Sequence, residues 1–442
     1  MGDFGGGISK GRKYLWHPFT QMQTAPPPIP VERAEGIYLH TQDGRRLLDG
    51  ISSWWVNIHG HNHPRLNRAL EEQASRMGHV LFAGCTHEPA ARLASELVRR
   101  APAGLSRVFF SDNGSTSVEV ALKMSYQYWK NRGETRDLFI SLKHAYHGDT
   151  LGAMGVGGVD AFHAQFADLL VKQLQTHSPT CRTCPVGRVR TTCHIECTGR
   201  LEDLLRESGH RVAAVIVEPM VQGAGGMIIW PVEFLNLVRE LTRRHGTLLI
   251  ADEVFTGFGR TGKMFACEHG PVTPDLMCLS KALTGGYLPL AATLVTEPLY
   301  QAFLSEDRGR GFLHGHSYTA NPLGCAVALE SLALFDEEER LERVARLAEL
   351  FSERLTRIAR LPGVAEVRGI GGLAVMELEA EGEAGYLDSR SPRLIQAFLE
   401  KGLLLRPLGN VLYFLPPYVI EDREAHRAFD VIEEVLVSIA QR

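Results

Sequence analysis

Residues 247–286 read TLLIADEVFTGFGRTGKMFACEHGPVTPDLMCLSKALTGG, and this stretch decides the fold. It contains two short apolar runs, Thr247–Ala251 and Asp275–Leu279. Neither run alternates apolar and polar residues, which is typical of strands buried on both faces of a parallel sheet. Asp252 directly follows the first run, and Lys281 follows the second in a glycine-rich turn. The stretch therefore predicts two buried strands with chemically active side chains at their carboxyl ends.

The same pattern continues toward the amino terminus. Apolar runs at Arg107–Ser111, Leu138–Leu142 and Val212–Val217 predict three further strands. Apolar residues at helical spacing predict helices over Thr116–Lys130 and Phe234–His245. Strands that alternate with helices indicate an α/β fold, with a mostly parallel sheet flanked by helices.

The two ends of the chain have a different sequence pattern from the middle. Residues 1 to about 45 look irregular apart from a strand-like run at Gly36–His40, and a turn connects that run to Arg46–Asp49. Residues 326–360 are rich in Ala, Leu, Glu and Arg and predict a long helix, with strands such as Gly372–Glu379 and Val411–Leu415 after it. These patterns predict a second, smaller α+β domain. We expect three parts: residues 1–66, an amino-terminal segment that contributes to the small domain and the active site; residues 67–325, the large domain; and residues 326–442, the carboxy-terminal small α+β domain.

Composition narrows the class of protein. The chain has 442 residues and a formal net charge of -4, and 44% of its residues are hydrophobic. This charge shows no excess of basic residues of the kind that binds nucleic acid or an anionic membrane surface. No apolar run approaches the ~18 residues that span a bilayer, and residues 1–16 lack the apolar core of a signal peptide. We therefore expect a cytoplasmic protein that acts on small molecules, not on nucleic acid or a membrane.

A turn of small residues follows the strand Arg107–Ser111. Residues 112–116, DNGST, lead into a helix, whose first amides lack backbone acceptors and whose positive dipole end attracts anions. Gly114 and Ser115 are small enough to let those amides approach a phosphate. For this turn taken alone, a capped helix without any ligand is the open alternative.

Three more residues at strand ends suggest a binding site. Asp252 would either face a cationic ring nitrogen or cap the next turn. Lys281 would be a nucleophile if burial lowered its pKa, or otherwise a surface lysine with a partly buried stem. Tyr146, in the turn after Leu138–Leu142, offers an aromatic face beside an acid, or is an ordinary core residue.

Together these four sites meet the needs of one cofactor. Pyridoxal 5'-phosphate requires an anchor for its phosphate, a face for its ring, an acid for its protonated ring nitrogen and a lysine for its aldehyde. Each signal is weak alone, but all four occur at the ends of predicted strands. We therefore interpret them as a single pyridoxal-phosphate site.

The motifs that carry these residues resemble the class III aminotransferases, of fold type I. Their order and spacing agree over nearly the whole chain. The matching motifs are residues 112–115, 146–150, 218–219 with 225–226, 251–254 with 256–262, 280–281 and 321–323. The resemblance implies a fold type I pyridoxal-phosphate-dependent transferase whose cofactor lies in the large domain.

Other segments resemble the branch of this family that aminates 8-amino-7-oxononanoate to 7,8-diaminononanoate in biotin synthesis. They are LWHPFTQM at 15–22, SSWWVNIHG at 52–60, GFGRTGKMFA at 257–266, HGHSY at 314–318 and LRPLG at 405–409. The resemblance implies ping-pong transamination, with S-adenosylmethionine as the default amino donor.

The resemblance also implies catalytic roles. By this resemblance, Lys281 forms the Schiff base with the cofactor and moves the proton during the reaction. Asp252 pairs with the protonated ring nitrogen. Tyr146 stacks on one face of the ring, and Val254 lies on the other.

The remaining implied roles concern the phosphate and the substrate. Gly114 and Ser115 bind the phosphate, and Ser317 reaches it from the second subunit, because family members are homodimers with shared active sites. Arg406 grips the substrate carboxylate, for which a planar guanidinium suits a bidentate bond. The implied substrate-binding residues are Phe19, Trp54, Trp55, Tyr146, Arg260, Gly315 and Arg406.

Two departures from the family pattern concern the amino donor. Many members have Tyr where this chain has Phe19, and Pro where it has His316, and both positions lie where the donor should sit. Lysine, which some relatives use, is therefore the alternative donor, and another ω-aminotransferase activity stays open as well. An inactive homologue that serves as a binding protein is disfavoured by the joint presence of Lys281, Asp252 and Tyr146.

A cysteine-rich segment stands apart from these motifs. Cys181 and Cys184 form one close pair, and Cys193 and Cys197 form another, with His194 beside them. Two such pairs are compatible with structural zinc. The three-residue gap in the second pair and the intervening Pro and Arg residues favour reduced thiols or a redox-labile pair. We therefore expect no bound metal, with structural zinc as the alternative.

Overall fold

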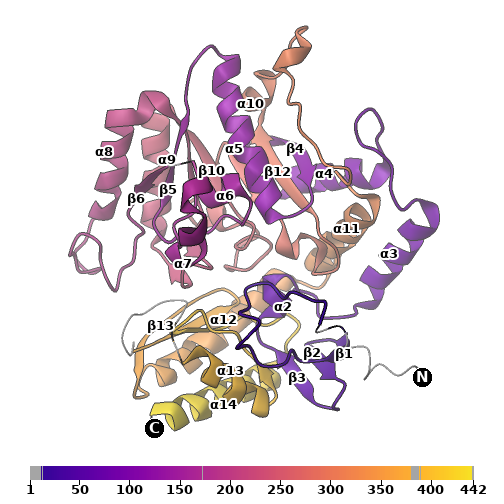
Figure 1. Ribbon diagram of the computed structural model, residues 1–442, viewed down its shortest axis with the longest axis vertical. Helices are drawn as coiled ribbons and strands as arrows, with labels where there is room; N and C mark the ends of the chain where they lie inside the picture. Colours follow the sequence, from indigo (N-terminus) through magenta and orange to yellow (C-terminus); the bar gives the residue numbers. More distant parts are fainter. Residues whose placement is uncertain (1–10, 12, 172, 380–387, 389, 441–442) are drawn as a thin grey trace.

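The computed structural model describes residues 11, 13–171, 173–379, 388 and 390–440. Residues 1–10, most of the stretch judged for signal-peptide character, lie outside the described residues. A larger body surrounds a central sheet, and a smaller body beneath it combines both ends of the chain (Figure 1). No helix among the described residues is long and apolar enough to cross a membrane.

A seven-stranded sheet forms the centre of the larger body. In order across the sheet, its strands are β4 (Leu105–Ser111), β12 (Ala291–Thr296), β11 (Leu276–Leu279), β10 (Leu248–Asp252), β7 (Val212–Val217), β5 (Leu138–Leu142) and β6 (Leu174–Thr176). Neighbouring strands are parallel except where β12 pairs with β4 and β11. The predicted α/β fold with a mostly parallel sheet is thus confirmed, although β12 and the edge strand β6 were not predicted.

Helices cover both faces of this sheet. On β11, Leu276 packs in a cluster with α5 (Gly114–Asn131), whereas Met277 packs in another cluster with α4 (Glu88–Arg100) and α11 (Pro322–Glu337). Because successive side chains of a strand point to opposite faces, the strand is buried on both sides. The other elements of this part of the chain are α3 (Pro64–Arg76), α6 (Leu151–Gly155), α7 (Asp160–His163), α8 (Gly199–Ser208), β8 (Val221–Gln222), β9 (Ile228–Ile229), α9 (Val232–Arg244) and α10 (Glu297–Gln301).

Two smaller sheets and three regular helices make up the smaller body, with the short element α2 (Ser52–Trp55) beside them (Figure 1). One sheet contains β1 (Val31–Glu35), β2 (Tyr38–Thr41), β3 (Arg46–Asp49) and β15 (Leu403–Leu404), and the other contains β13 (Val364–Ile370), β14 (Leu373–Leu378) and β16 (Val411–Phe414). The helices are α12 (Arg340–Ile358), α13 (Ser391–Glu400) and α14 (Asp422–Ala440). Since β15 pairs with β3, amino-terminal and carboxy-terminal residues share one sheet. The strand β1 was not predicted, because residues 1 to about 45 look irregular apart from the run Gly36–His40.

The long helix predicted over residues 326–360 is wrong in its continuity. Helix α11 ends at Glu337 and α12 begins at Arg340. Between them, Glu339 has a φ of 50°, a left-handed conformation that does not occur inside a right-handed α-helix. Helix α11 packs on α3 and α4, whereas α12 packs on β13 and β14. The first half of the predicted helix therefore packs on helices of the larger body, and the second half packs on a sheet of the smaller body. The division of the chain at residues 66 and 325 remains a prediction.

Candidate active site

A cavity of about 730 Å³ opens at the carboxyl ends of several sheet strands, where α/β folds bind ligands. Strands β4, β10 and β11 each lead directly into its lining. The lining contains these predicted site residues: Trp55, Gly114, Ser115, Tyr146, Asp252, Val254 and Lys281.

One end of the cavity is formed by the first turn of α5. Asn113 caps this helix, and its side chain accepts a hydrogen bond from the Thr116 amide at 3.0 Å. The hydroxyls of Ser115 and Thr150 lie 2.7 Å apart. Gly148 has a φ of 126°, and a Cβ there would stand 2.3 Å from the Ser115 hydroxyl. The glycine thus keeps space for an anion beside the hydroxyls and the positive end of the helix.

Asp252 is the buried acid of the cavity, with 4% of its surface exposed. One carboxylate oxygen lies 2.7 Å from Nδ1 of His147, and the other accepts a hydrogen bond from the Val254 amide at 3.1 Å. Two partners from different segments fix the carboxylate in one orientation. A fixed anion in a buried cavity is suited to pairing with a cationic ring nitrogen.

A second buried acid, Glu218, lies in the same wall. Its carboxylate accepts hydrogen bonds from the amides of Tyr146 and Gly223, both at 2.9 Å. Burial is the main cause that raises the pKa of Glu218 to about 7, and the nearby Asp252 acts in the same direction. Glu218 therefore links the turn that carries Tyr146 to the strand end after β7.

Lys281 lies against aromatic rings, with its Nζ 4.6 Å from the ring centroid of Trp55 and 5.5 Å from that of Phe255. Burial lowers the pKa of Lys281 to about 8, and Arg260 adds to this effect while Asp252 opposes it. The amine is therefore more readily neutral, and so more nucleophilic, than an exposed lysine.

The tryptophan pair sits on a left-handed turn. Four consecutive residues, Ser52–Trp55, have φ values of 49°, 45°, 70° and 74°. This left-handed backbone conformation is strained for any residue other than glycine. The Ser52 hydroxyl donates to the Leu415 carbonyl at 2.7 Å, and the Ser53 hydroxyl donates to Asp49 at 2.7 Å. These bonds hold the turn so that Trp55 lines the cavity while Trp54 lies outside its lining.

An aromatic cluster continues from the cavity toward the surface. Phe19 lies 5.5 Å from Trp54 and 5.5 Å from Phe162, and Phe162 lies 5.8 Å from Tyr146, all measured between ring centroids. The guanidinium of Arg406 stands 4.9 Å from the Trp54 ring centroid. Phe19, Trp54 and Arg406 are therefore together, although they do not line the cavity itself.

Three predicted residues are not part of this assembly. Arg260 is 1% exposed, does not line the cavity and lies over the ring of Tyr418. Its terminal nitrogens find no hydrogen-bond partner among the described residues, and its charge acts on Lys281. Gly315 and Ser317 are exposed, in the loop before α11, and do not line the cavity of their own chain.

Sequence reasoning missed several residues of the site, among them His147, Thr150, Glu218, Phe255 and Phe162. The first three lie within motifs that the resemblance had already drawn attention to, so their proximity to Tyr146 or to a strand end was the available signal. Phe162 lies in the four-residue helix α7, which is too short to give a periodic pattern.

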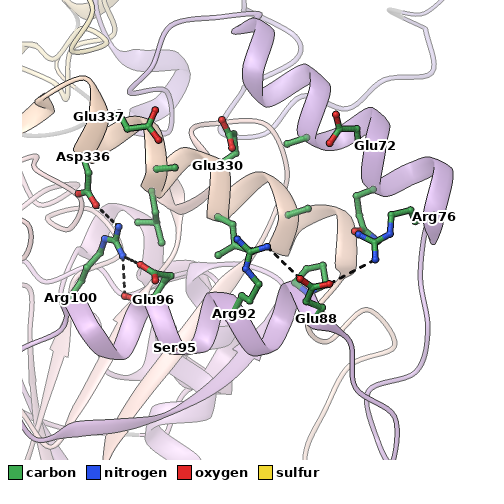
Figure 2. Close-up of a pocket in the computed structure, with 17 residues that line it drawn as sticks. Glu72, Arg76, Glu88, Arg92, Ser95, Glu96, Arg100, Glu330, Asp336 and Glu337 are labelled. Carbon is green, nitrogen blue, oxygen red and sulfur yellow. Dashed lines mark hydrogen bonds and ion pairs between the residues drawn. The ribbon is translucent and has the colours of Figure 1, made fainter.

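A second hollow, of about 620 Å³, lies between α3, α4 and α11 (Figure 2). Its charged side chains largely pair with one another: Arg100 bonds to Glu96 and, at 2.5 Å, to Asp336, while Arg92 lies 3.5 Å from Glu88. Because these charged side chains already have partners, few of them are free to bind a ligand. The first cavity is therefore the candidate active site.

Comparisons with known proteins agree with this site. The profile of the family described as Aminotransferase class-III matches residues 19–436. The adenosylmethionine-8-amino-7-oxononanoate aminotransferase of Synechococcus elongatus is 47% identical over 427 residues, which cover 96% of this chain and 99% of that protein. The solved structure of the aminotransferase of the same name from Methanocaldococcus jannaschii has a TM-score of 0.93 at 37% identity and covers 99% of each chain. An omega transaminase of Pseudomonas jessenii in complex with PMP has a TM-score of 0.93 at 29% identity, over 98% of each chain.

The cofactor that this family implies is pyridoxal phosphate. The residues present fit it, because the cavity joins an anion cradle at α5, a fixed acid at Asp252 and a lysine of lowered pKa at Lys281. By its sequence, its fold and this site, the chain belongs to the class III aminotransferases.

Proposed function

We propose that this aminotransferase converts 8-amino-7-oxononanoate to 7,8-diaminononanoate in biotin synthesis, with S-adenosylmethionine as the amino donor. The names of its relatives support this reaction. The observation that carries it is the arrangement of one apolar wall, from Trp55 through Tyr146 to Phe19, with Lys281 at its inner end and Arg406 at its outer end.

Pyridoxal phosphate, when bound, withdraws electrons from the carbon that loses a proton. In our proposal the phosphate is held by Gly114, Ser115 and the first turn of α5. Asp252 keeps the ring nitrogen protonated, with His147 orienting the carboxylate. Tyr146 and Val254, which both line the cavity, would pack against the ring.

Lys281 is the residue proposed to bond to the cofactor and to move the proton. A pKa of about 8, lowered mainly by burial, leaves part of the amine neutral near neutral pH, where an ordinary lysine is almost fully charged. Trp55 and Phe255 beside the amine exclude water from it. The neutral amine can then accept a proton and return it to a neighbouring carbon.

The substrate chain is proposed to lie along the aromatic wall. Trp54, Trp55 and Phe19 offer apolar contacts for its methylene groups, which favour burial. Arg406 would bind the distal carboxylate through two parallel hydrogen bonds. Arg260, a buried cation without a hydrogen-bond partner among the described residues, suits a second anionic group such as a donor carboxylate.

We infer a homodimer that completes each site. Gly315 and Ser317 lie in an exposed loop that follows the highly exposed Leu313. Leu313 and Val171, which are 83% and 71% exposed, line a surface hollow of about 1040 Å³. Apolar surface of this kind favours cover by another chain, and a second copy would bring Ser317 to the phosphate. None of the eight cysteines forms a disulfide bond, which fits the reducing cytoplasm that we propose as the location.

Lysine is the second candidate donor, because Phe19 carries no hydroxyl and His316 lies 2.8 Å from Asp112 in the loop of the donor region. The deciding experiment supplies 8-amino-7-oxononanoate with either S-adenosylmethionine or lysine and measures 7,8-diaminononanoate. Product with S-adenosylmethionine alone supports the proposal, and product with lysine alone replaces the donor. Product with neither, in a yellow enzyme that other amines bleach, would assign a different ω-aminotransferase reaction.

A further inference from the structure

Outside the active site, four cysteines come together around one small hollow. Cys181, Cys184, Cys193 and Cys197 all line it, and its volume is about 20 Å³. That space takes one water molecule or one ion, but no organic ligand. None of its lining residues lines the active-site cavity.

The segment that carries these cysteines is long and irregular. Residues 177–195 contain no helix or strand, although runs beyond about 12–15 residues without such structure are uncommon inside compact domains. Arginines of this segment form ion pairs with Glu377 and Glu233, but these are largely exposed and contribute little. These ion pairs alone therefore do little to fix the conformation of the segment.

The turn between the last two cysteines is strained. Ile195 has a φ of 63° and is 4% exposed, and a β-branched residue in this conformation is an outlier that surrounding contacts must enforce. Ile195 lies between Cys193 and Cys197 in the chain and lines the same hollow as both, so its strained conformation belongs to the cysteine cluster.

We propose that Cys181, Cys184, Cys193 and Cys197 bind one zinc ion and so crosslink the two turns of this segment. Four thiols lose four protons and donate one sulfur each, which completes a tetrahedral shell and leaves no open position for catalysis. The resulting complex carries two negative charges, and Arg190, whose guanidinium lies 3.9 Å from the Cys193 sulfur, offsets part of them. The proposed site is structural, and it takes up the zinc alternative that the cysteine spacing left open.

Zinc binding requires side-chain rotation. As the side chains stand, no group of three or more His, Cys, Asp or Glu side chains among the described residues could hold a metal ion. The Cys181 sulfur lies 3.8 Å from the Pro179 carbonyl, and the Cys193 sulfur contacts Arg190. Rotation about χ1 moves a cysteine sulfur between staggered positions while the backbone stays in place.

The test measures zinc in the untagged, full-length enzyme with its cofactor bound, purified without chelator. Elemental analysis should find about one zinc ion per chain, the stoichiometry of a single four-cysteine site. A mercurial thiol reagent should release that zinc to a colorimetric dye. The double variant Cys184→Ser/Cys197→Ser should lose the zinc, whereas Cys85→Ser, which changes an exposed cysteine outside the cluster, should keep it.

Cobalt provides a measurement that does not depend on the variants folding. Protein grown with cobalt in place of zinc should show the visible absorption of cobalt in a tetrahedral thiolate shell, after subtraction of the cofactor spectrum. Two outcomes would overturn the proposal: a protein without zinc in which the four thiols titrate freely, or a disulfide among them in non-reducing mass spectrometry.

Discussion

The cofactor end and the substrate end of the active site are built differently. At the cofactor end, Asp252 is 4% exposed and is held by His147 and a backbone amide. At the substrate end, Trp54 is 39% exposed and Phe19 is 43% exposed. The first end is fixed by strands of the large sheet, and the second depends on a strained turn and an amino-terminal segment. The contrast suggests that the chemistry is set by the sheet, whereas substrate choice is set by residues that become covered on binding.

The largest expected effect follows from Lys281→Ala, which tests whether residues at the ends of the sheet strands perform the chemistry. Loss of the amine that moves the proton should lower turnover by a factor of about a thousand or more. The protein should still fold and bind the phosphate of the cofactor, because α5 is unchanged. Single-turnover kinetics measure the loss, and Lys401→Ala, at a surface ion pair, is the control. Turnover close to wild type would remove Lys281 from the mechanism.

Asp252→Asn tests the second fixed group at the same end. The amide has a similar shape but no charge, so the ring nitrogen loses its ionic partner and the rate should fall about 100-fold. The affinity for 8-amino-7-oxononanoate should change little, since the acid lies away from the substrate wall. Steady-state kinetics with both substrates measure this, and Asp43→Asn, on an exposed turn, is the control. An unchanged rate would mean that the carboxylate serves only to hold His147.

The positions of the residues at the cofactor end could also be predicted from local sequence patterns. Val212–Val217 and Leu138–Leu142 match β7 and β5 residue for residue, because strands buried on both faces leave one clear apolar pattern. A residue directly after such a strand, like Asp252 or Lys281, then has a known place at the sheet edge. Local sequence and tertiary position agree there, so the inference needs no long-range contact.

The substrate end follows from contacts that no local pattern reveals. Nothing in the sequence SSWW favours four left-handed residues, and the conformation at Ser52–Trp55 is held by bonds to Leu415 and Asp49. Phe162 meets Phe19 across more than a hundred residues of chain. The break at Glu339 has the same origin, because its neighbours are good helix formers and tertiary packing overrides their propensity.

Arg406→Lys examines the substrate end directly. Lysine keeps the charge but loses the planar fork that binds a carboxylate through two bonds, so KM for 8-amino-7-oxononanoate should rise about tenfold. The maximal rate should remain within about threefold of wild type, because the ground state and the transition state lose the same contact. Arg33→Lys, in an exposed ion pair, is the matched control. A fall in maximal rate without a change in KM would place Arg406 in the chemistry and break the division between the two ends.

The smallest effect is expected from Ser53→Ala, which loosens the turn without touching the substrate. The Ser53 hydroxyl donates to Asp49, a carboxylate with no exposed surface that also bonds His61 at 2.9 Å. Losing one such bond should lower the free energy of unfolding by about 1–2 kcal/mol. Because the turn then holds Trp54 less firmly, KM for 8-amino-7-oxononanoate should rise about threefold with the maximal rate unchanged. Denaturant unfolding and steady-state kinetics measure the two effects, with Ser75→Ala on the surface of α3 as the control. If stability falls while KM stays constant, the left-handed turn supports the fold alone, and the exposed tryptophan does not depend on it for its place in the substrate wall.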